Sequence, residues 1–401
     1  MDPFQLLLKP VSGKCNLACS YCFYRTVPSQ FPHKALSVMP DTLLKIIIKK
    51  YLELGFAENV FIWQGGEPTL AGLEFFKRVI KYQQQFGRGQ VVGNVLQTNG
   101  TLLNERWIEF LAKYRFFVGL SIDGPRDIHD ASRGEGTHTI AMKAAELLVK
   151  YKVEFNVLSV IHKGNVDKIR EMYLFLRQGP SPFLQFIPAL DNDPISSTPM
   201  SHSITFQQYG NALCTLFDVW KDRDSTKISI RDFDSVLNSY LGLTGVTCTN
   251  KDTCASYLVI ENQGDVYPCD FFVKPHYFLG NIVQDNFKTL LARRKISFEG
   301  LKVSRDPVCN KCQWRMLCFG GCPKDREFKI NQFPLRSYLC PAYKRFFQHS
   351  FHWFANHSLS IAREHHLKSI FIDHLDPQQP CLCGSGFPLQ NCLRKTGLEL
   401  A

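Results

Sequence analysis

The first half of the chain alternates between two kinds of segment, and this alternation restricts the fold more than any other feature of the sequence. From residue 5 to about residue 235, short apolar, β-branched or aromatic runs alternate with longer segments of helical period, about six times. The runs expected to be strands are 5–10, 60–64, 94–98, 116–122, 155–161 and 183–189. The helical patterns between them are 42–54, 73–86, 105–113, 140–151 and 167–177.

This alternation predicts the fold class. Near-continuous apolar strands joined by helices indicate a parallel sheet that is covered on both faces. Six units are too few for a closed eightfold barrel, so we expect an α/β fold with a partial, open (β/α)6 barrel. Within the fourth helical segment, Ile140, Ala144, Leu147 and Leu148 follow helical spacing and are expected to share the face turned toward the core.

The alternation stops near Val246, and a cysteine-rich segment follows. Residues 248–340 hold eight of the fifteen cysteines, with a hairpin signal where SYLVIE meets DVYPCD. Because this segment has little regular core, we expect it to depend on bound metal. Residues 341–372 are expected to be helical, and QQP at 378–380 precedes a small Cys/Gly module. The resulting domain boundaries are 1–235, 236–350, 351–377 and 378–401.

Composition restricts the class of protein. With 401 residues and 45% apolar side chains, the chain is long enough for real hydrophobic cores. The 47 Lys and Arg exceed the 36 Asp and Glu by 11, but no run of five or more basic residues occurs, so a nucleic-acid partner is not indicated. No apolar run reaches the ~18 residues that cross a bilayer, and no secretion signal is visible. We therefore expect a cytoplasmic protein without a membrane partner, whose cysteines serve metal or redox chemistry.

Three cysteines stand close together near the start of the chain. Cys15, Cys19 and Cys22 are spaced CxxxCxxC directly after the first expected strand, which places them at the C-terminal edge of the sheet. A structural zinc takes four ligands, so this set is one short. A four-iron cluster held by three thiolates keeps one iron free of protein ligands. Buried cysteines without a metal are the alternative.

Further motifs accompany this set. WQGGEPTL at 63–70, QTNG at 97–100 and LSIDG at 120–124 occur in order, each at the end of an expected strand. Together with CxxxCxxC they resemble the radical S-adenosylmethionine (SAM) superfamily. The resemblance implies that the open iron chelates SAM and that an electron from the cluster cleaves it to a 5′-deoxyadenosyl radical.

The resemblance also implies roles for single residues. Gly65 and Gly66 would let the backbone approach the ligand, and Glu67 would accept hydrogen bonds from the SAM ammonium group. Ser121, Asp123 and Arg133 match positions that contact the ribose and carboxylate. The remaining matches near SAM or the substrate are Tyr21, Tyr24, Gln64 and Leu190.

Eight later cysteines form two sets of four. Two structural zincs would satisfy the same count. Downstream of a radical SAM domain, however, their spacing resembles the SPASM extension, which holds two auxiliary 4Fe-4S clusters and so brings the total to three. The sets implied are Cys248, Cys254, Cys269 and Cys322 for one cluster, and Cys309, Cys312, Cys318 and Cys340 for the other. Cys214, inside a helical run, is expected to be a core residue.

Several stretches resemble one subgroup in detail, the anaerobic sulfatase-maturating enzymes. They are CNLACSYCFY, WQGGEPTL, QFIPAL, GDVYPCDFFV and CFGGCPKDR. The resemblance implies that a peptidyl cysteine or serine, most simply of a sulfatase, loses a Cβ hydrogen and becomes Cα-formylglycine. Asp270, directly after Cys269, matches the carboxylate that removes a proton. A flavodoxin- or ferredoxin-type reductant would be the electron donor.

The last segment, PCLCGSGFPLQNCLRKTG, resembles the small SEC-C zinc motif. Cys381, Cys383 and Cys392 match three ligands, but Leu393 stands at the fourth position. His374 or a partner could supply the missing ligand, or the module could have lost its metal. We expect a docking role for it.

Two other functions compete with sulfatase maturation. A SPASM enzyme could instead form a thioether or carbon crosslink in a peptide. A zinc-stabilised binding protein would use the same cysteines without SAM chemistry. Iron content together with SAM cleavage distinguishes the enzymes from the binding protein.

Overall fold

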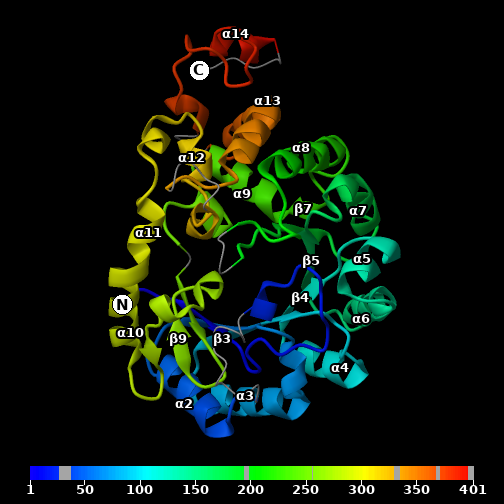
Figure 1. The fold of residues 1–401 in the computed structure, drawn as a ribbon, viewed down its shortest axis with the longest axis vertical. Coiled ribbons are helices and arrows are strands. Elements are labelled where there is room, and N and C mark those ends of the chain that lie inside the picture. Colours follow the sequence, from blue (N-terminus) through cyan, green and yellow to red (C-terminus); the bar gives the residue numbers. More distant parts are fainter. Residues whose placement is uncertain (27–37, 194–197, 255, 329–334, 367–370, 396–401) are drawn as a thin grey trace. The chain divides into compact units, whose positions relative to one another are not determined.

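Parallel strands and the helices between them form two units in a computed structural model of the chain (Figure 1). The residues described are 1–26, 38–193, 198–254, 256–328, 335–366 and 371–395. The first unit comprises Met1–Ser159, Gln178–Ser181 and Ala255–Gly300, and the second comprises Val160–Arg177, Pro182–Cys254 and Leu301–Ala401. Each unit therefore combines segments that lie far apart in the sequence. The domain boundaries expected from the sequence stay predictions.

The first unit is built on a mostly parallel sheet in the order β10-β9-β8-β1-β2-β3-β4-β5. Its strands are β1 (Gln5–Leu8), β2 (Glu58–Trp63), β3 (Val91–Thr98), β4 (Phe117–Ser121), β5 (Phe155–Ile161), β8 (Tyr257–Ile260), β9 (Asp265–Tyr267) and β10 (Gly280–Asn281). Neighbours from β8 through β1 to β5 run parallel, whereas β9 pairs antiparallel with both β8 and β10. The expected strands β1 to β5 are confirmed within a few residues.

The helices of the first unit cover the outer side of these strands (Figure 1). They are α2 (Asp41–Leu52), α3 (Leu73–Phe86), α4 (Glu105–Lys113), α5 (Arg126–Arg133), α6 (Thr137–Lys150) and α10 (Phe287–Arg294). Strand β2 buries every second residue, and its Trp63 packs edge-to-face on Phe75 and Phe76 of α3. The bounds of α3 and α4 agree with those expected from helical period.

The expected core face of α6 is wrong in one part. Ile140 lies 44% exposed, and the buried face instead carries Ala141, Ala144, Ala145 and Leu148. Small alanine side chains let the helix pack closely, so the face is set by the alanines rather than by the larger residue. A single apolar side chain on the surface is common in folded proteins.

The second unit contains a short parallel pair, β6 (Phe183–Pro188) and β7 (Ser229–Ile230), and a group of helices. The helices are α7 (Ile169–Leu176), α8 (Phe206–Lys221), α9 (Arg231–Tyr240), α11 (Gly300–Val303, at the unit boundary), α12 (Arg315–Cys318), α13 (Cys340–Glu364) and α14 (Leu389–Arg394). Phe233 of α9 and Phe346 of α13 stack in its core, and Phe217 of α8 packs edge-to-face against both. Cys214 is buried in α8, as expected.

One expectation for the cysteine-rich part is confirmed, and the long helix expected after it is present but shorter than expected. Strands β8 and β9 form the expected antiparallel hairpin, and Gly264 in its turn adopts φ +89°, which favours glycine. The long helix expected over 341–372 is α13, which ends at Glu364. Residues 367–370 of that prediction lie outside the described residues.

Candidate active site

The C-terminal ends of the parallel strands carry the predicted site residues of the first unit. Because β1, β2, β3 and β4 are parallel neighbours, the loops that follow them lie along one edge of the sheet. The three cysteines follow β1, GGEP follows β2, and Asn99 follows β3. Ser121 ends β4, and Asp123 comes two residues later. The fold therefore brings the sequence motifs together at this edge.

The cysteine loop contains three buried or half-buried thiols. Cys19 is buried, whereas Cys15 and Cys22 are partly exposed. Burial raises the pKa of each thiol, and each thiol also raises the pKa of one of the others, as expected of three sulfur atoms that lie close together. Three neighbouring thiols form a donor set that suits an iron–sulfur cluster.

The two glycines of GGEP contact the cysteine loop. The Gly66 amide donates to the Ser12 carbonyl oxygen (2.8 Å), and the next amide donates to the Lys14 carbonyl oxygen (2.8 Å). A Cβ atom on Gly65 would lie 2.5 Å from the Ser12 oxygen, and one on Gly66 would lie 2.0 Å from the Lys14 oxygen. The glycines thus pack against the loop that carries the cysteines. Sequence reasoning missed this contact. Their expected approach to SAM stays a prediction.

A Gly66→Ala substitution is expected to displace the cysteine loop. The new Cβ would overlap backbone atoms, and such overpacking costs roughly 1–3 kcal/mol. We expect the variant to lose about four irons per chain, those of one 4Fe-4S cluster, together with SAM cleavage. Iron analysis after anaerobic reconstitution measures this loss. Gly93→Ala in β3 is the matched control, because its Cβ would meet atoms no closer than 3.8 Å; equal iron content in the two variants would contradict the prediction.

Glu67 connects GGEP to the next strand. Its carboxylate is fully buried, and Oε1 accepts hydrogen bonds from the Thr69 amide (3.0 Å), the Thr69 hydroxyl (2.6 Å) and the Thr98 hydroxyl (2.8 Å). Oε2 accepts from the Asn99 amide (2.8 Å). Burial outweighs these bonds and raises the pKa of Glu67 above its ordinary value. The carboxylate therefore orders the strand ends, and its predicted bond to the SAM ammonium stays a prediction.

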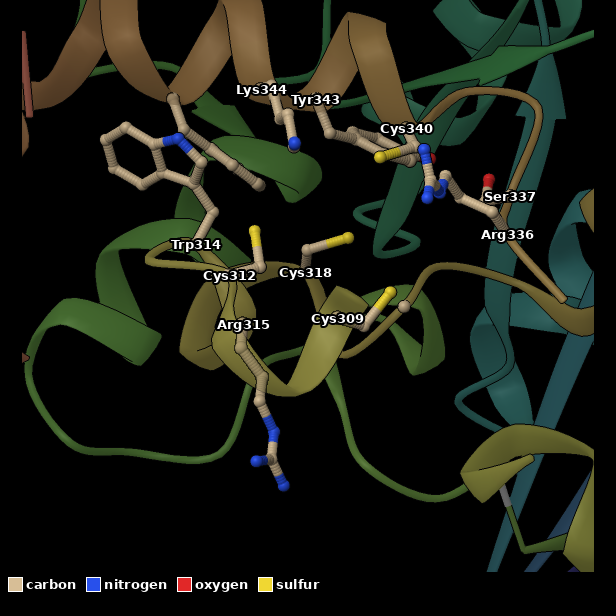
Figure 2. Close-up of a pocket in the computed structure, with 12 residues that line it drawn as sticks. Cys309, Cys312, Trp314, Arg315, Cys318, Arg336, Ser337, Cys340, Tyr343 and Lys344 are labelled. Atoms are coloured by element: carbon tan, nitrogen blue, oxygen red, sulfur yellow. The ribbon is translucent and has the colours of Figure 1, made fainter. Parts of the chain in front are cut away.

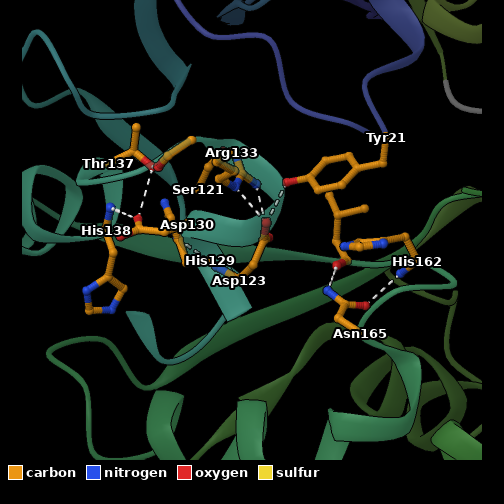
Figure 3. Close-up of polar contacts among 12 residues, drawn as sticks. Tyr21, Ser121, Asp123, His129, Asp130, Arg133, Thr137, His138, His162 and Asn165 are labelled. Carbon is orange, nitrogen blue, oxygen red and sulfur yellow. Dashed lines mark hydrogen bonds and ion pairs between the residues drawn. The ribbon is translucent and has the colours of Figure 1, made fainter. Parts of the chain in front are cut away.

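Tyr21, Asp123 and Arg133 form one buried network (Figure 3). The Arg133 guanidinium donates from Nε to Asp123 Oδ2 (2.7 Å) and from Nη2 to Oδ1 (3.1 Å). The Tyr21 hydroxyl donates to Oδ2 (2.5 Å), and the guanidinium carbon lies 5.5 Å from the Tyr21 ring centroid. The network ties the cysteine loop to the end of β4 and the end of α5.

Neighbouring groups fix this network in place. The Asp123 amide donates to His129 Nδ1 (3.2 Å), and burial lowers the pKa of His129 to about 4, so the ring is neutral and accepts. Asp130 accepts from the backbone amides of Gly136 (3.0 Å) and His138 (2.8 Å) and so caps the first turn of α6. The Ser121 hydroxyl accepts from Gln97 (3.3 Å).

Asp270 is buried and held by side chains from the segments that follow β1 and β2. Its Oδ2 accepts from the Tyr24 hydroxyl and from Gln64 Nε2 (3.0 Å), and the Gln64 amide also donates to the Tyr24 oxygen (3.0 Å). Burial, and then the charge of Asp270, raises the pKa of Tyr24 well above its ordinary value, so the phenol stays protonated. Three residues that the sequence placed near the substrate thus lie together in the first unit.

A lysine that sequence reasoning missed completes this group. Lys9 directly follows β1 and is fully buried, with Nζ 2.7 Å from Asp270 Oδ1 and 3.1 Å from Glu261 Oε1. Burial alone would lower the pKa of Lys9, but the two carboxylates raise it above its ordinary value. The parallel pairing of β1 with β8 places Lys9 beside Glu261. The signal in the sequence was a charged residue of opposite sign directly after each of these two strands, Lys9 after β1 and Glu261 after β8.

Four cysteines of the second unit line one cavity, as the SPASM resemblance implies (Figure 2). The sulfur atoms of Cys309, Cys312, Cys318 and Cys340 surround a common space. Arg336 and Lys344 line the same cavity and have the charge that suits an anionic iron–sulfur cluster.

The other predicted set is divided between the units. Cys248, Cys254 and Cys322 belong to the second unit, where the buried Lys302 donates from Nζ to the carbonyl oxygens of Cys248 (3.1 Å), Thr249 (3.2 Å) and Gly321 (2.6 Å). Cys269 belongs to the first unit, where its Sγ lies 3.1 Å from the Tyr257 hydroxyl. This set of four ligands stays a prediction.

The remaining predicted residues lie in the second unit. Leu190 follows β6 and is buried. Cys381, Cys383 and Cys392 converge in the C-terminal module. In the part of the chain that the structure describes, no helix is long and apolar enough to span a membrane.

Two family models match the chain. The Radical SAM superfamily model matches residues 10–176, which include the cysteine loop and the motifs after β2, β3 and β4. The SPASM model, an iron-sulfur cluster-binding domain, matches residues 248–313. The loops that follow β1, β2, β3 and β4 therefore lie within the radical SAM match, whereas Glu261 and Asp270 lie within the SPASM match.

Known relatives define the family more closely. A cysteine-type anaerobic sulfatase-maturating enzyme of Clostridium perfringens is 38% identical over 360 residues, which cover 88% of this chain and 97% of that protein. The chain belongs to the anaerobic sulfatase-maturating enzymes. A serine-type member from Bacteroides thetaiotaomicron is 34% identical over 370 residues, covering 86% of this chain and 89% of that one. The predicted family is thus confirmed.

A solved structure of an anaerobic sulfatase-maturating enzyme confirms the fold class. Native anSMEcpe with bound AdoMet and Cp18Cys peptide matches with a TM-score of 0.81 and 36% identity, covering 90% of this chain and all of that one. The present chain matches both the radical SAM and the SPASM models, and as a member of this family it uses 4Fe-4S clusters and SAM. The cysteine loop and the four-cysteine cavity have the donor sets that such clusters require.

Proposed function

We propose that this chain oxidises the Cβ atom of a cysteine or serine in a protein substrate, most simply a sulfatase, to the aldehyde of Cα-formylglycine. The proposal is supported by the identity with cysteine-type and serine-type members of the family. A relative's structure contains a peptide together with AdoMet. The observation that carries the chemistry is the buried carboxylate of Asp270, held by Lys9, Tyr24 and Gln64.

Cys15, Cys19 and Cys22 would hold the cluster that binds SAM. The eight cysteines from Cys248 to Cys340 would hold two auxiliary clusters. When bound, these groups supply hydrogen-atom abstraction and an acceptor for one electron. The residues predicted to contact SAM are Tyr21, Gly65, Gly66, Glu67, Ser121, Asp123, Arg133 and Leu190.

Asp270 would act as the base. Conversion of the CH2–OH or CH2–SH group to C=O or C=S removes one hydrogen atom from Cβ, one proton from the heteroatom and one electron. The proton passes to Asp270, whose Oδ1 atom lies 2.7 Å from Lys9 Nζ. Tyr24 and Gln64 donate to the same carboxylate oxygen and so fix its direction. For cysteine, water then replaces sulfur in the C=S group and releases hydrogen sulfide.

Anaerobic turnover of matched peptides tests this function. The reconstituted chain, SAM and a chemical reductant are incubated with peptides that differ in one residue, cysteine, serine or alanine. Mass spectrometry with a carbonyl-specific reagent is expected to detect an aldehyde on the cysteine peptide, the serine peptide or both, and none on the alanine peptide. A thioether or a carbon crosslink, or SAM cleavage without aldehyde on either peptide, would overturn the proposal.

The same reactions address two further predictions. The relative yields on cysteine and serine peptides define the substrate type. Replacing the chemical reductant by a flavodoxin or a ferredoxin tests the predicted class of electron donor. The cytoplasmic location stays a prediction.

A further inference from the structure

The C-terminal module contains three cysteines that meet a histidine from a different part of the second unit. The ligand atoms of His352, Cys381, Cys383 and Cys392 all lie within 4.8 Å of one another. His352 belongs to α13, whereas the cysteines belong to the segment that ends in α14. Cys381 and Cys392 are buried, and the other two groups are partly exposed. The sequence offered three ligands here, and the fold supplies a fourth.

Two distances in this cluster are close to those between ligands of tetrahedral zinc. With Zn–S bonds of ~2.3 Å and a Zn–N bond of ~2.05 Å, neighbouring ligand atoms would stand about 3.8 Å apart for S···S and about 3.6 Å apart for S···N. Cys383 Sγ lies 3.6 Å from Cys392 Sγ, and Cys392 Sγ lies 3.4 Å from His352 Nε2. The sulfur–sulfur distance far exceeds the ~2.05 Å of a disulfide.

The backbone of the module folds tightly around two of the cysteines, Cys381 and Cys383. The Cys381 amide donates to the Phe387 carbonyl oxygen (2.7 Å), and the Gly384 amide donates to the Cys381 carbonyl oxygen (3.0 Å). Gly384 and Gly386 adopt φ of +82° and +78°, which glycine permits without strain. The CGSG sequence thus forms a tight turn that points Cys381 and Cys383 at the same place.

One face of α13 meets this turn. Gln348 and His352 are four residues apart and therefore lie on the same side of the helix. Gln348 Nε2 donates to the Cys383 carbonyl oxygen (3.2 Å), and a Cβ on Gly384 would lie 2.2 Å from that nitrogen. Two residues of α13, one helical turn apart, therefore contact the C-terminal module.

We propose that His352 of α13, with Cys381, Cys383 and Cys392, forms a four-coordinate zinc site that fixes the C-terminal module to the helix. The site is closed, since all four positions are filled by protein, and its role is structural. Three thiolates and one imidazole in tetrahedral arrangement suit zinc among the common metals.

This ligand set differs from the candidates that the sequence offered. Leu393, at the position where the related motif has a ligand, is fully buried as part of the small core of the module. His374 is not among the four groups that converge in the described part of the chain. His352 of α13 takes the place of the ligand that is missing at position 393, so no partner protein is required to complete the site.

X-ray absorption at the zinc edge tests the site in the full, iron-loaded chain. After exposure to one equivalent of zinc, we expect about one zinc per chain with three sulfur neighbours at ~2.3 Å and one nitrogen neighbour at ~2.0 Å. A zinc environment of four sulfurs, or no zinc retained after gel filtration, would overturn the proposal.

Variants test the histidine directly. His352→Ala is expected to lower the zinc affinity, measured by competition with a chelator, at least about 10-fold, and to remove the nitrogen neighbour from the absorption spectrum. His357→Ala is the matched control, because His357 also lies on α13 but stacks on Trp353 at 4.6 Å. Equal zinc affinity in the two variants would exclude His352 as a ligand.

Discussion

In an Asp270→Asn variant, SAM cleavage is expected to continue while peptide oxidation falls by about 10²–10⁴-fold. The asparagine amide keeps the shape of the carboxylate but does not accept a proton. Lys9 and Tyr24 still lie beside the side chain, so the cysteine loop is expected to keep its structure. The 5′-deoxyadenosine and the peptide aldehyde are measured in the same anaerobic reaction, by chromatography and mass spectrometry.

An exposed aspartate provides the control for this variant. Asp167→Asn changes the same functional group at a solvent-exposed position and is expected to leave both products unchanged. An unchanged aldehyde yield in Asp270→Asn would remove Asp270 from the role of base. Loss of both products would show that Asp270 supports the structure of the site rather than the proton transfer.

Removal of Asp123 is expected to destabilise the first unit strongly. In Asp123→Ala, the Arg133 charge stays buried without its carboxylate, and the Tyr21 hydroxyl loses its acceptor. Breaking a buried ion pair from one side costs about 3–5 kcal/mol of the free energy of unfolding. Urea denaturation followed by tryptophan fluorescence measures this loss, together with SAM affinity by equilibrium dialysis.

A double variant separates stability from SAM binding. Asp123→Ala combined with Arg133→Met removes both charges and fills the space with an apolar side chain, so most of the stability is expected to return. SAM binding is expected to stay impaired, because both predicted contacts are absent. A loss below about 1 kcal/mol in the single variant would contradict the view that this buried pair holds β4, α5 and the cysteine loop together.

Local patterns in the sequence were sufficient for most of the barrel. Strands β1 to β6 are short apolar, β-branched or aromatic runs, and helices α3 and α4 follow a period of 3.6 residues; both patterns are visible in a short window. Ile140 shows the limit of this reasoning, because helical spacing alone does not distinguish a face of alanines from a face with one larger residue. The extension of the sheet by β8 beside β1 left no local pattern, since it pairs segments that are distant in the chain.

Site residues that belong to a family motif could be predicted from the sequence. Residues that reach the site only through the tertiary fold could not. Asp270, Tyr24 and Gln64 came from a resemblance, and the structure places them together. Lys9 escaped notice because a lysine at the end of a strand is usually solvated. His352 escaped notice because α13 holds several histidines, and the sequence does not show which of them faces the cysteine module.

A peptide carrying two deuterium atoms at the Cβ atom of its target residue gives the most direct test of the proposed function. After anaerobic turnover, deuterium is expected in the 5′-deoxyadenosine, and the aldehyde is expected to keep one deuterium at the oxidised carbon. A peptide deuterated at Cα is expected to transfer none. Aldehyde formation with unlabelled 5′-deoxyadenosine, or transfer from Cα, would contradict oxidation that begins at Cβ.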